Sequence, residues 1–179
     1  MTDKEIIHLF KSESTREKAF TGLVKMYSEK LYWHVRRMVT EHEDANDIVQ
    51  NAFIKIWKGL SGFKEESQLY TWLYRIATNE AITFINKNKK KQTTSLDHVM
   101  DSPAYITQNE HNTDSDVIAG KLQHAIDTLP AKQKQVFVMR YYDEMKYEDM
   151  EAVLGTSVGA LKASFHHAVK KIESFLASN

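Results

Sequence analysis

Apolar residues recur along this chain with the spacing of an α-helix, and the alternating runs typical of β-strands are scarce. The first long run places apolar residues three or four positions apart from Phe20 to Val39. Ser14 and Glu17, just before it, have the spacing of a capping box. This pattern predicts a helix over about residues 15–39, and its recurrence to the end of the chain predicts an all-α protein.

Two more helices are expected in the first half of the chain. The segment DANDIVQNAFIKIWKGL, residues 44–60, carries an apolar stripe made of Ala45, Ile48, Val49, Ala52 and Ile56. Two glycines and a polar cluster then predict a loop over residues 59–67. Residues 69–88 follow as a long helix, whose inward stripe consists of Leu69, Leu73, Ile76, Ala77 and Phe84.

The second half begins with a segment that lacks periodic apolar spacing. Residues 92–116 are rich in Thr, Ser, Asn and Asp, which predicts a linker with little fixed structure of its own. Two amphipathic helices follow, over residues 117–129 and 132–142, and Pro130 is well placed to open the second.

The last part of the chain has the pattern of a helix-turn-helix. A short helix, YEDMEAVL, is followed by a glycine turn and by a longer amphipathic segment, SVGALKASFHHAVKKIESFL. The predicted fold is therefore two small helical domains joined by an acidic linker, the second containing the helix-turn-helix. The expected boundaries are 1–91, 92–116 and 117–179.

Composition excludes several classes of function. The chain has 179 residues and no cysteine, which removes disulfides, thiolate nucleophiles and cysteine zinc sites. No apolar run is long enough to span a bilayer and the N-terminus lacks a signal pattern, so we expect a cytoplasmic protein without direct membrane insertion. Paired catalytic carboxylates, nucleophile motifs and glycine-rich phosphate loops are not found, so we expect neither an enzyme nor a cofactor.

A net charge of zero argues at first against binding to nucleic acid. The balance, however, arises from opposite local charges. Lys87, Lys89, Lys90 and Lys91 form a basic run, whereas residues 97–116 carry acidic residues and no lysine or arginine. A basic stretch therefore lies beside an acidic one, and the two nearly cancel.

The final helix has a surface suited to the DNA major groove. Val158, Leu161, Phe165, Ala168 and Ile172 share one side, which turns other residues outward. The outward residues are Ala160, Ala163, His167 and Lys170. Small side chains let a helix lie deep in the groove, and the cations can reach phosphates or bases. The alternative is a helical hairpin with merely solvated lysines. The adjacent His166 and His167 point about 100 degrees apart, so no metal site is expected.

The helix over residues 69–88 carries more aromatic surface than one inward stripe can hold. Trp72 and Asn79 lie along one flank, Tyr74 lies on the other, and Arg75 faces outward. Rings beside a cation and a lysine run suit an unstacked nucleic-acid strand, because bases stack on rings and lysines meet phosphates. The alternative is that Tyr70, Trp72 and Tyr74 complete the packing of a small bundle.

Four motifs together resemble the bacterial RNA polymerase sigma factors of the extracytoplasmic-function group. They are DANDIVQNAFIKIW at 44–57, YTWLYRIATNEA at 70–81, LP at 129–130 and SVGALKASFHHAVKKI at 157–172. Their order and spacing match the family from about Ala19 to Leu176.

For the first domain, this resemblance implies contact with the promoter -10 element and with core RNA polymerase. The loop from Gly62 to Gln68 corresponds to the family's specificity loop, which captures a flipped base. The implied -10 residues are Phe63, Lys64, Ser67, Gln68, Tyr70, Trp72, Tyr74, Arg75, Asn79, Lys87 and Lys89. The helix of residues 44–57 corresponds to the one that docks on the polymerase clamp coiled coil, through Asp47, Gln50, Asn51 and Ile54.

For the second domain, the resemblance implies recognition of the -35 element while the polymerase flap tip holds the domain. The implied contacts are Ser157, Ala160, Lys162, Ala163, Ser164, His166, His167 and Lys170. The acidic segment resembles the connector that threads the RNA-exit channel, where negative charge imitates RNA. A cognate anti-sigma factor is also implied.

Three departures from the family pattern change the expected contacts. Thr83 and Asn86 stand where many members carry aspartate and arginine, which shifts phosphate contact toward the lysine run. Glu151 replaces a small residue at the crossing of the helix-turn-helix, where a buried carboxylate would be costly, so the helices are expected to pack apart or rotate. Ser164 replaces a common arginine.

The sequence therefore predicts a transcription initiation factor that directs polymerase to promoters and assists strand opening. Two other classes stay open at this point. One is a stand-alone helix-turn-helix regulator that binds a palindrome as a dimer. The other is a helical adaptor for protein interactions, in which Trp72 and Tyr74 would be buried.

Overall fold

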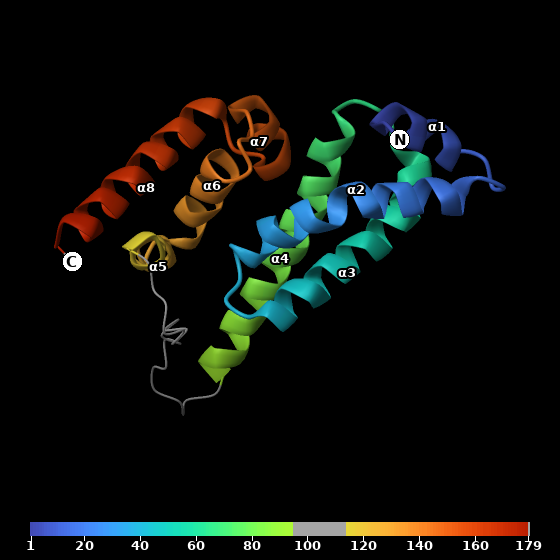
Figure 1. Ribbon diagram of the computed structural model, residues 1–179. Coiled ribbons are helices and arrows are strands. Elements are labelled where there is room, and N and C mark those ends of the chain that lie inside the picture. The colour runs from blue at the N-terminus through green and yellow to red at the C-terminus, as the bar shows by residue number, and fades with distance from the viewer. Residues whose placement is uncertain (95–113, 179) are drawn as a thin grey trace.

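The computed structural model describes residues 1–94 and 114–178 of the chain, and Figure 1 shows that they form two groups of helices. All the regular secondary structure in these residues is helical, as the apolar spacing predicted. In chain order the elements are α1 (Asp3–Phe10), α2 (Arg16–Arg36), α3 (His42–Gly59), the short 3-10 turn η1 (Leu60–Gly62), α4 (Leu69–Thr94), α5 (Asp114–Asp127), α6 (Ala131–Tyr141), α7 (Tyr147–Leu154) and α8 (Val158–Ser178).

The first domain consists of α1 to α4, with α2 packed against the other three helices. The predicted stripe of α3 is confirmed, because all five of its residues are buried. On α4, Leu69, Leu73 and Ala77 are buried as expected, whereas Ile76 and Phe84 are only half-buried. Burying a leucine side chain contributes about 2 kcal/mol, so these stripes hold the domain together.

The N-terminal helix α1 was not predicted, and the capping box was assigned to the wrong helix. Thr2 and Glu5 form the box: the Glu5 amide donates to Thr2 at 3.3 Å, and the Thr2 amide donates to the Glu5 carboxylate at 2.6 Å. Ser14 instead lies against the Ser12 hydroxyl, and α2 begins without a side-chain cap.

The second domain consists of α5 to α8, with α8 in contact with the other three helices. A separate core cluster joins α5, α6 and α8, made of Ala125, Ile126, Leu129, Phe137, Ala168 and Ile172, whereas Met150 and Val153 of α7 belong to the larger cluster that includes the first domain. Helices α7 and α8 form the predicted helix-turn-helix. Gly155 makes the turn with a φ of 67°, a left-handed conformation that favours glycine, and its amide donates to the Glu151 carbonyl at 2.8 Å.

Both ends of the segment predicted as a linker, residues 92–116, are helical. Helix α4 continues to Thr94 and α5 starts at Asp114, so residues 92–94 and 114–116 are helical. Residues 95–113 lie outside the described residues.

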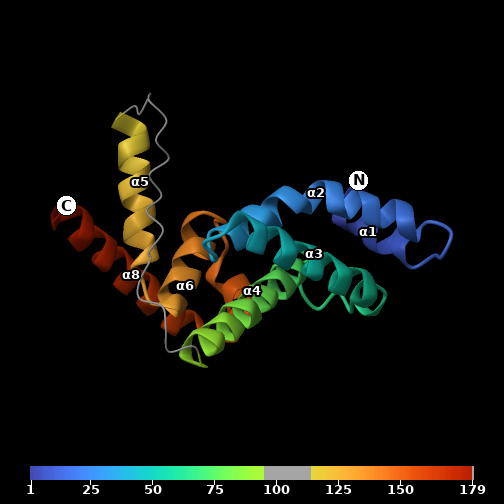
Figure 2. The ribbon, with the colours of Figure 1, turned by 90° about the horizontal axis from the view of Figure 1, so that it is seen from below.

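The two domains pack against each other through α4 and α7. Three methionines of the second domain, Met139, Met145 and Met150, are buried in the same apolar cluster as the core of the first domain. Figure 2 shows α1 at the end of the first domain farthest from α5 and α8. Because α4 contacts α7, part of the helix that was predicted to meet DNA lies near the domain boundary.

Candidate nucleic-acid and polymerase interfaces

The loop after α3 and the start of α4 form a cavity of about 460 Å³. Its lining combines predicted -10 residues with one residue from the other domain: Gly62, Phe63, Lys64, Glu66, Ser67, Trp72, Arg75 and Ala152. The Trp72 and Phe63 rings lie 5.2 Å apart between centroids. A Cβ added to Gly59 would lie 3.3 Å from the Trp72 ring, so glycine at this position leaves room for it. Two rings, a guanidinium and the Ser67 hydroxyl around a cavity suit a nucleobase.

Other predicted -10 residues lie on the open side of α4. Arg75 and Asn79 are exposed one helical turn apart, and Lys87 and Lys89 are exposed toward the end of the helix. Gln68 is exposed just before the helix begins. The loop and this row of exposed side chains thus lie at the start and along the open side of the same helix.

Two tyrosines depart from the expected exposed strip, Tyr74 through packing within the first domain and Tyr70 through a contact with the second. Tyr74 is only 7% exposed and packs against the His34 ring, with 4.8 Å between centroids. Burial, then the Asp143 carboxylate, raise the pKa of Tyr74 above its ordinary value. Tyr70 is half-buried; burial, then its hydrogen bond to Asp149, raise the pKa of Tyr70 to about 12.

Polar contacts that sequence reasoning missed join the two domains. His34 is fully buried on α2, and its Nδ1 lies 2.6 Å from the carboxylate of Asp143, in the loop after α6. Its Nε2 lies 2.8 Å from the hydroxyl of Thr78 on α4. The Arg37 guanidinium lies 4.2 Å from the centre of the Tyr142 ring. No local pattern in the sequence pairs residues so distant along the chain.

The predicted polymerase-docking residues lie on the open face of α3. Asp47, Gln50 and Asn51 are exposed, and Ile54 is 48% exposed although it is apolar. The spacing of these residues places them on one side of the helix, away from its buried stripe. A half-exposed isoleucine amid polar side chains is typical of a protein-binding surface.

The outward face of α8 matches the predicted recognition surface. Ala160, Lys162, Ala163, His166, His167 and Lys170 are exposed, as is Ser157, whereas Ser164 is half-buried. The Ser157 hydroxyl accepts a hydrogen bond from the Ala160 amide at 3.4 Å and so caps the helix. The expected problem at Glu151 does not occur, because Glu151 is exposed while Met150 and Val153 face the core.

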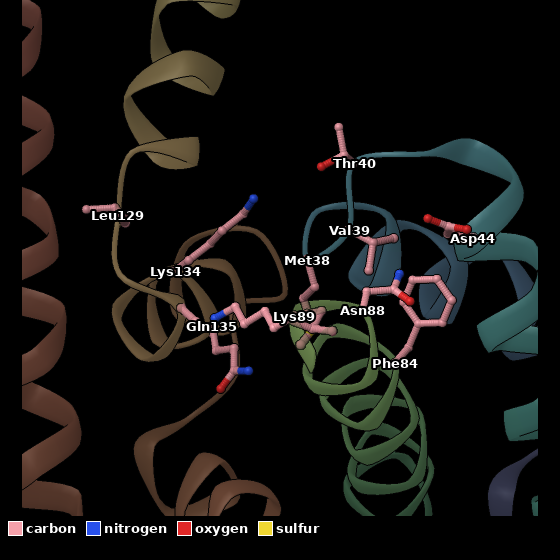
Figure 3. Close-up of a pocket in the computed structure, with 12 residues that line it drawn as sticks. Met38, Val39, Thr40, Asp44, Phe84, Asn88, Lys89, Leu129, Lys134 and Gln135 are labelled. Atoms are coloured by element: carbon pink, nitrogen blue, oxygen red, sulfur yellow. The ribbon is translucent and has the colours of Figure 1, made fainter. Parts of the chain in front are cut away.

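A cleft between the domains was also missed from the sequence. Figure 3 shows that side chains from the loop after α2, from α4 and from α6 surround it. Its volume is about 340 Å³. Its apolar lining includes Met38, Phe84 and Leu129, with Lys89 and Lys134 also present. Asp44, at the start of α3, lies on the same cleft, and burial, then the Glu41 carboxylate, raise its pKa.

Within the described parts of the chain, no cluster of three or more potential ligands could hold a metal ion. In the same residues no helix is both long and apolar enough to cross a bilayer.

Two family models match the chain, and each falls on one domain. The model of sigma-70 region 2 matches residues 23–91, and that of sigma-70, region 4, matches residues 119–172. The interval between them contains the segment predicted as a linker.

Curated relatives match over most of their length. The ECF RNA polymerase sigma factor SigW of Bacillus subtilis (strain 168) is 30% identical over 162 residues, which cover 83% of this chain and 83% of the relative. The ECF RNA polymerase sigma-E factor of Escherichia coli (strain K12) is 27% identical over 182 residues, which cover 97% of this chain and 94% of the relative.

Two solved structures share the fold across both domains. The structure of CnrH in complex with the cytosolic domain of CnrY matches with a TM-score of 0.73 and 20% identity, covering 99% of this chain and 98% of that chain. The sigma factor RpoE in complex with the anti-sigma factor NepR, from Bartonella quintana, matches with a TM-score of 0.75 and 22% identity, covering 89% and 98%.

Proposed function

The chain belongs to the extracytoplasmic-function group of RNA polymerase sigma factors, initiation factors that bind core polymerase and direct it to promoters, and from this premise we propose how its surfaces divide that work. The first domain reads and opens the -10 element. The second domain reads the -35 element. Residues 92–116 act as the connector between the two domains in the polymerase channel.

The -10 assignment is supported by the surface formed by the loop and α4. The cavity beside Phe63 and Trp72 accepts a base that has left the stack. Arg75 and Asn79 continue along the exposed side, where they meet the backbone or a neighbouring base. Capturing a base from the non-template strand offsets the cost of unstacking it, and this drives strand opening.

Core polymerase docks on the open face of α3. Ile54 supplies apolar area and Asp47, Gln50 and Asn51 surround it, so the patch suits the clamp coiled coil. The helix is exposed on this side and buried on the other, so docking requires no rearrangement of the first domain.

The -35 assignment is supported by the outward face of α8. Ala160 and Ala163 are small and exposed, which lets the helix backbone approach the base edges. Lys162 and Lys170 then lie beside the groove, where they reach phosphates. The flap tip holds this domain, so the chain need not bind DNA strongly by itself.

An anti-sigma factor is the proposed regulatory partner. The support is that RpoE of the same fold was solved with the anti-sigma factor NepR. The cleft of Figure 3, with its apolar lining and two lysines, is the candidate seat for an amphipathic acidic segment of such a partner.

The observation that carries the proposal is that two separate exposed surfaces, on α4 and α8, occur in domains that match sigma regions 2 and 4. In vitro transcription with core polymerase and a library of genomic fragments tests it. We expect initiation at defined sites that share two sequence elements. Initiation only at random positions, as with core polymerase alone, would refute the proposal.

The stand-alone regulator is separated from this function by footprinting without polymerase. Strong, stoichiometric protection of a palindrome by the chain alone would favour the regulator. For the adaptor, Tyr74 is indeed buried against the His34 ring of the first domain, whereas Trp72 is only half-buried and lines the loop cavity.

A further inference from the structure

Helix α7 of the second domain covers the part of α4 that the proposed function assigns to the promoter strand. Ala152 forms one wall of the loop cavity. Asp149, almost one turn earlier on α7, reaches the first turn of α4. Part of the proposed -10 surface is thus covered by α7, and Asp149 makes the polar contacts of this cover.

The Asp149 carboxylate accepts hydrogen bonds from the hydroxyl groups of two adjacent residues of α4. The Tyr70 hydroxyl donates to one carboxylate oxygen, and the Thr71 hydroxyl donates to the other at 3.2 Å. Thr71 is buried, with 2% of its surface exposed, although it is polar. Two hydroxyls aimed at the two oxygens of one anion form a small anion-binding site.

A phosphodiester offers the same acceptors as a carboxylate, since two unesterified oxygens share one negative charge. Tyrosine and threonine hydroxyls are common donors to nucleic-acid phosphates. The site lies on the same helix as Trp72 and Arg75, and Asp149 lies on the same helix as Ala152; Trp72, Arg75 and Ala152 line the cavity that would hold a base. A strand that enters the cavity thus passes between the two helices that carry the hydroxyls and the carboxylate.

We propose that Tyr70 and Thr71 form a binding site for a phosphate of the promoter strand, and that Asp149 occupies this site as an internal substitute until the domains separate. The inference rests on the proposed function and adds its regulation. With α7 in place, the carboxylate blocks the site and repels a phosphate. When polymerase draws the second domain away, Asp149 leaves and the strand takes its place.

Further polar contacts also hold the two domains together with α7 against α4, which fits this role. His34 bonds to Asp143, and Arg37 lies over Tyr142, both across the domain boundary. Polar contacts of this kind are geometrically specific yet exchange readily with water when the domains part. Asp149 differs from them because its partners lie on the strand-binding helix.

Binding of a fluorescent single-stranded 12-nucleotide DNA of mixed sequence to the full chain, without polymerase, tests the proposal. We expect Asp149→Ala to raise the affinity about tenfold, the effect of freeing a charge-assisted site. The matched control is Glu148→Ala, which removes an exposed acid from the same first turn of α7 and should leave the affinity unchanged.

A second substitution identifies the site itself. In the Asp149→Ala chain, Tyr70→Phe or Thr71→Val should remove most of the gain. Should Asp149→Ala unfold the chain, Asp149→Asn keeps the shape without the charge and is expected to give a smaller gain. Equal affinities for the Asp149 and Glu148 variants, or a gain that survives loss of both hydroxyls, would overturn the proposal.

The outcome is separable from that of the proposed function. Promoter-directed transcription by the unmodified chain with core polymerase reports the function alone. If such transcription occurs while the Asp149 variants bind DNA no better than the unmodified chain, only the inference about the phosphate site fails.

Discussion

In the proposed function, single exposed residues on α3 and α4 carry the two tasks of the first domain, and these residues can be substituted without disturbing the core. The stripe residues beneath them could be predicted from helical periodicity alone, and so could the exposure of Asp47 and Asn79. The burial of Tyr74 could not be predicted in this way, because its ring packs against His34 of another helix, α2.

Ile54 is expected to strengthen polymerase binding without stabilising the fold. Because the side chain is half-exposed, Ile54→Ala should leave the melting temperature almost unchanged while weakening binding to core polymerase about tenfold. Binding is measured by fluorescence titration of the labelled chain. Ile118→Ala removes an equally apolar and more exposed side chain from α5 and serves as the control. Equal effects of the two substitutions would contradict the docking surface.

Asn79 is expected to act in strand opening. Asn79→Ala should reduce the rate of open-complex formation about fivefold, the effect of one lost hydrogen bond, and leave polymerase affinity intact. Permanganate reactivity of unpaired thymines measures the opening. Asp47→Ala should show the reverse, with core binding lost first. If both variants lose polymerase affinity equally, the division between α3 and α4 is wrong.

At the scale of the element, helices α7 and α8 show which features of a helix pair could be predicted from the sequence. Their pairing could be predicted because a glycine separates two amphipathic segments, and the structure confirms the turn at Gly155. The expected cost of burying Glu151 does not arise. A match to the family pattern does not say which side of a helix faces the core, and in α7 that side is the one with Met150 and Val153. Helix α1 was missed since its signals, Thr2 and Glu5, lie at the very start of the chain.

Two glycines near the turn should respond to alanine with opposite signs. Gly155 has a positive φ, so Gly155→Ala should destabilise the chain by about 1 kcal/mol although the space around it is open. Gly159 lies within α8, also in open space, so Gly159→Ala should stabilise it by about 0.5–1 kcal/mol. Urea denaturation measures both. A stabilising Gly155→Ala would show that the turn is not left-handed.

The outward face of α8 can be tested without disturbing the element. Ala163 is exposed on the groove side, so Ala163→Glu should keep the fold but abolish transcription that depends on the -35 element, because the carboxylate would meet DNA phosphates. The control is Ala177→Glu, the same change at an exposed position near the other end of α8. Reporter transcription distinguishes them, and equal activity of the two variants would exclude this face from promoter contact.

At the scale of the whole molecule, the packing of the two domains decides which surfaces are available. Helix α4 carries residues that we assign to DNA, yet the hydroxyls of Tyr70 and Thr71 bond to Asp149 of the second domain, and Thr71 is buried. The sequence predicted both domains and the helix-turn-helix, because periodicity and local turns specify them. It did not predict the closed arrangement, which depends on contacts such as His34 with Asp143 between distant positions.

The most direct test measures the distance between the domains before and after polymerase binds. The chain has no cysteine, so Lys25→Cys on α2 and Glu173→Cys on α8, both at exposed positions, provide two sites for a fluorophore pair. We expect the distance between the two fluorophores to be longer in the complex with core polymerase and promoter DNA than in the free chain. An unchanged distance in a complex that initiates transcription would contradict this expectation.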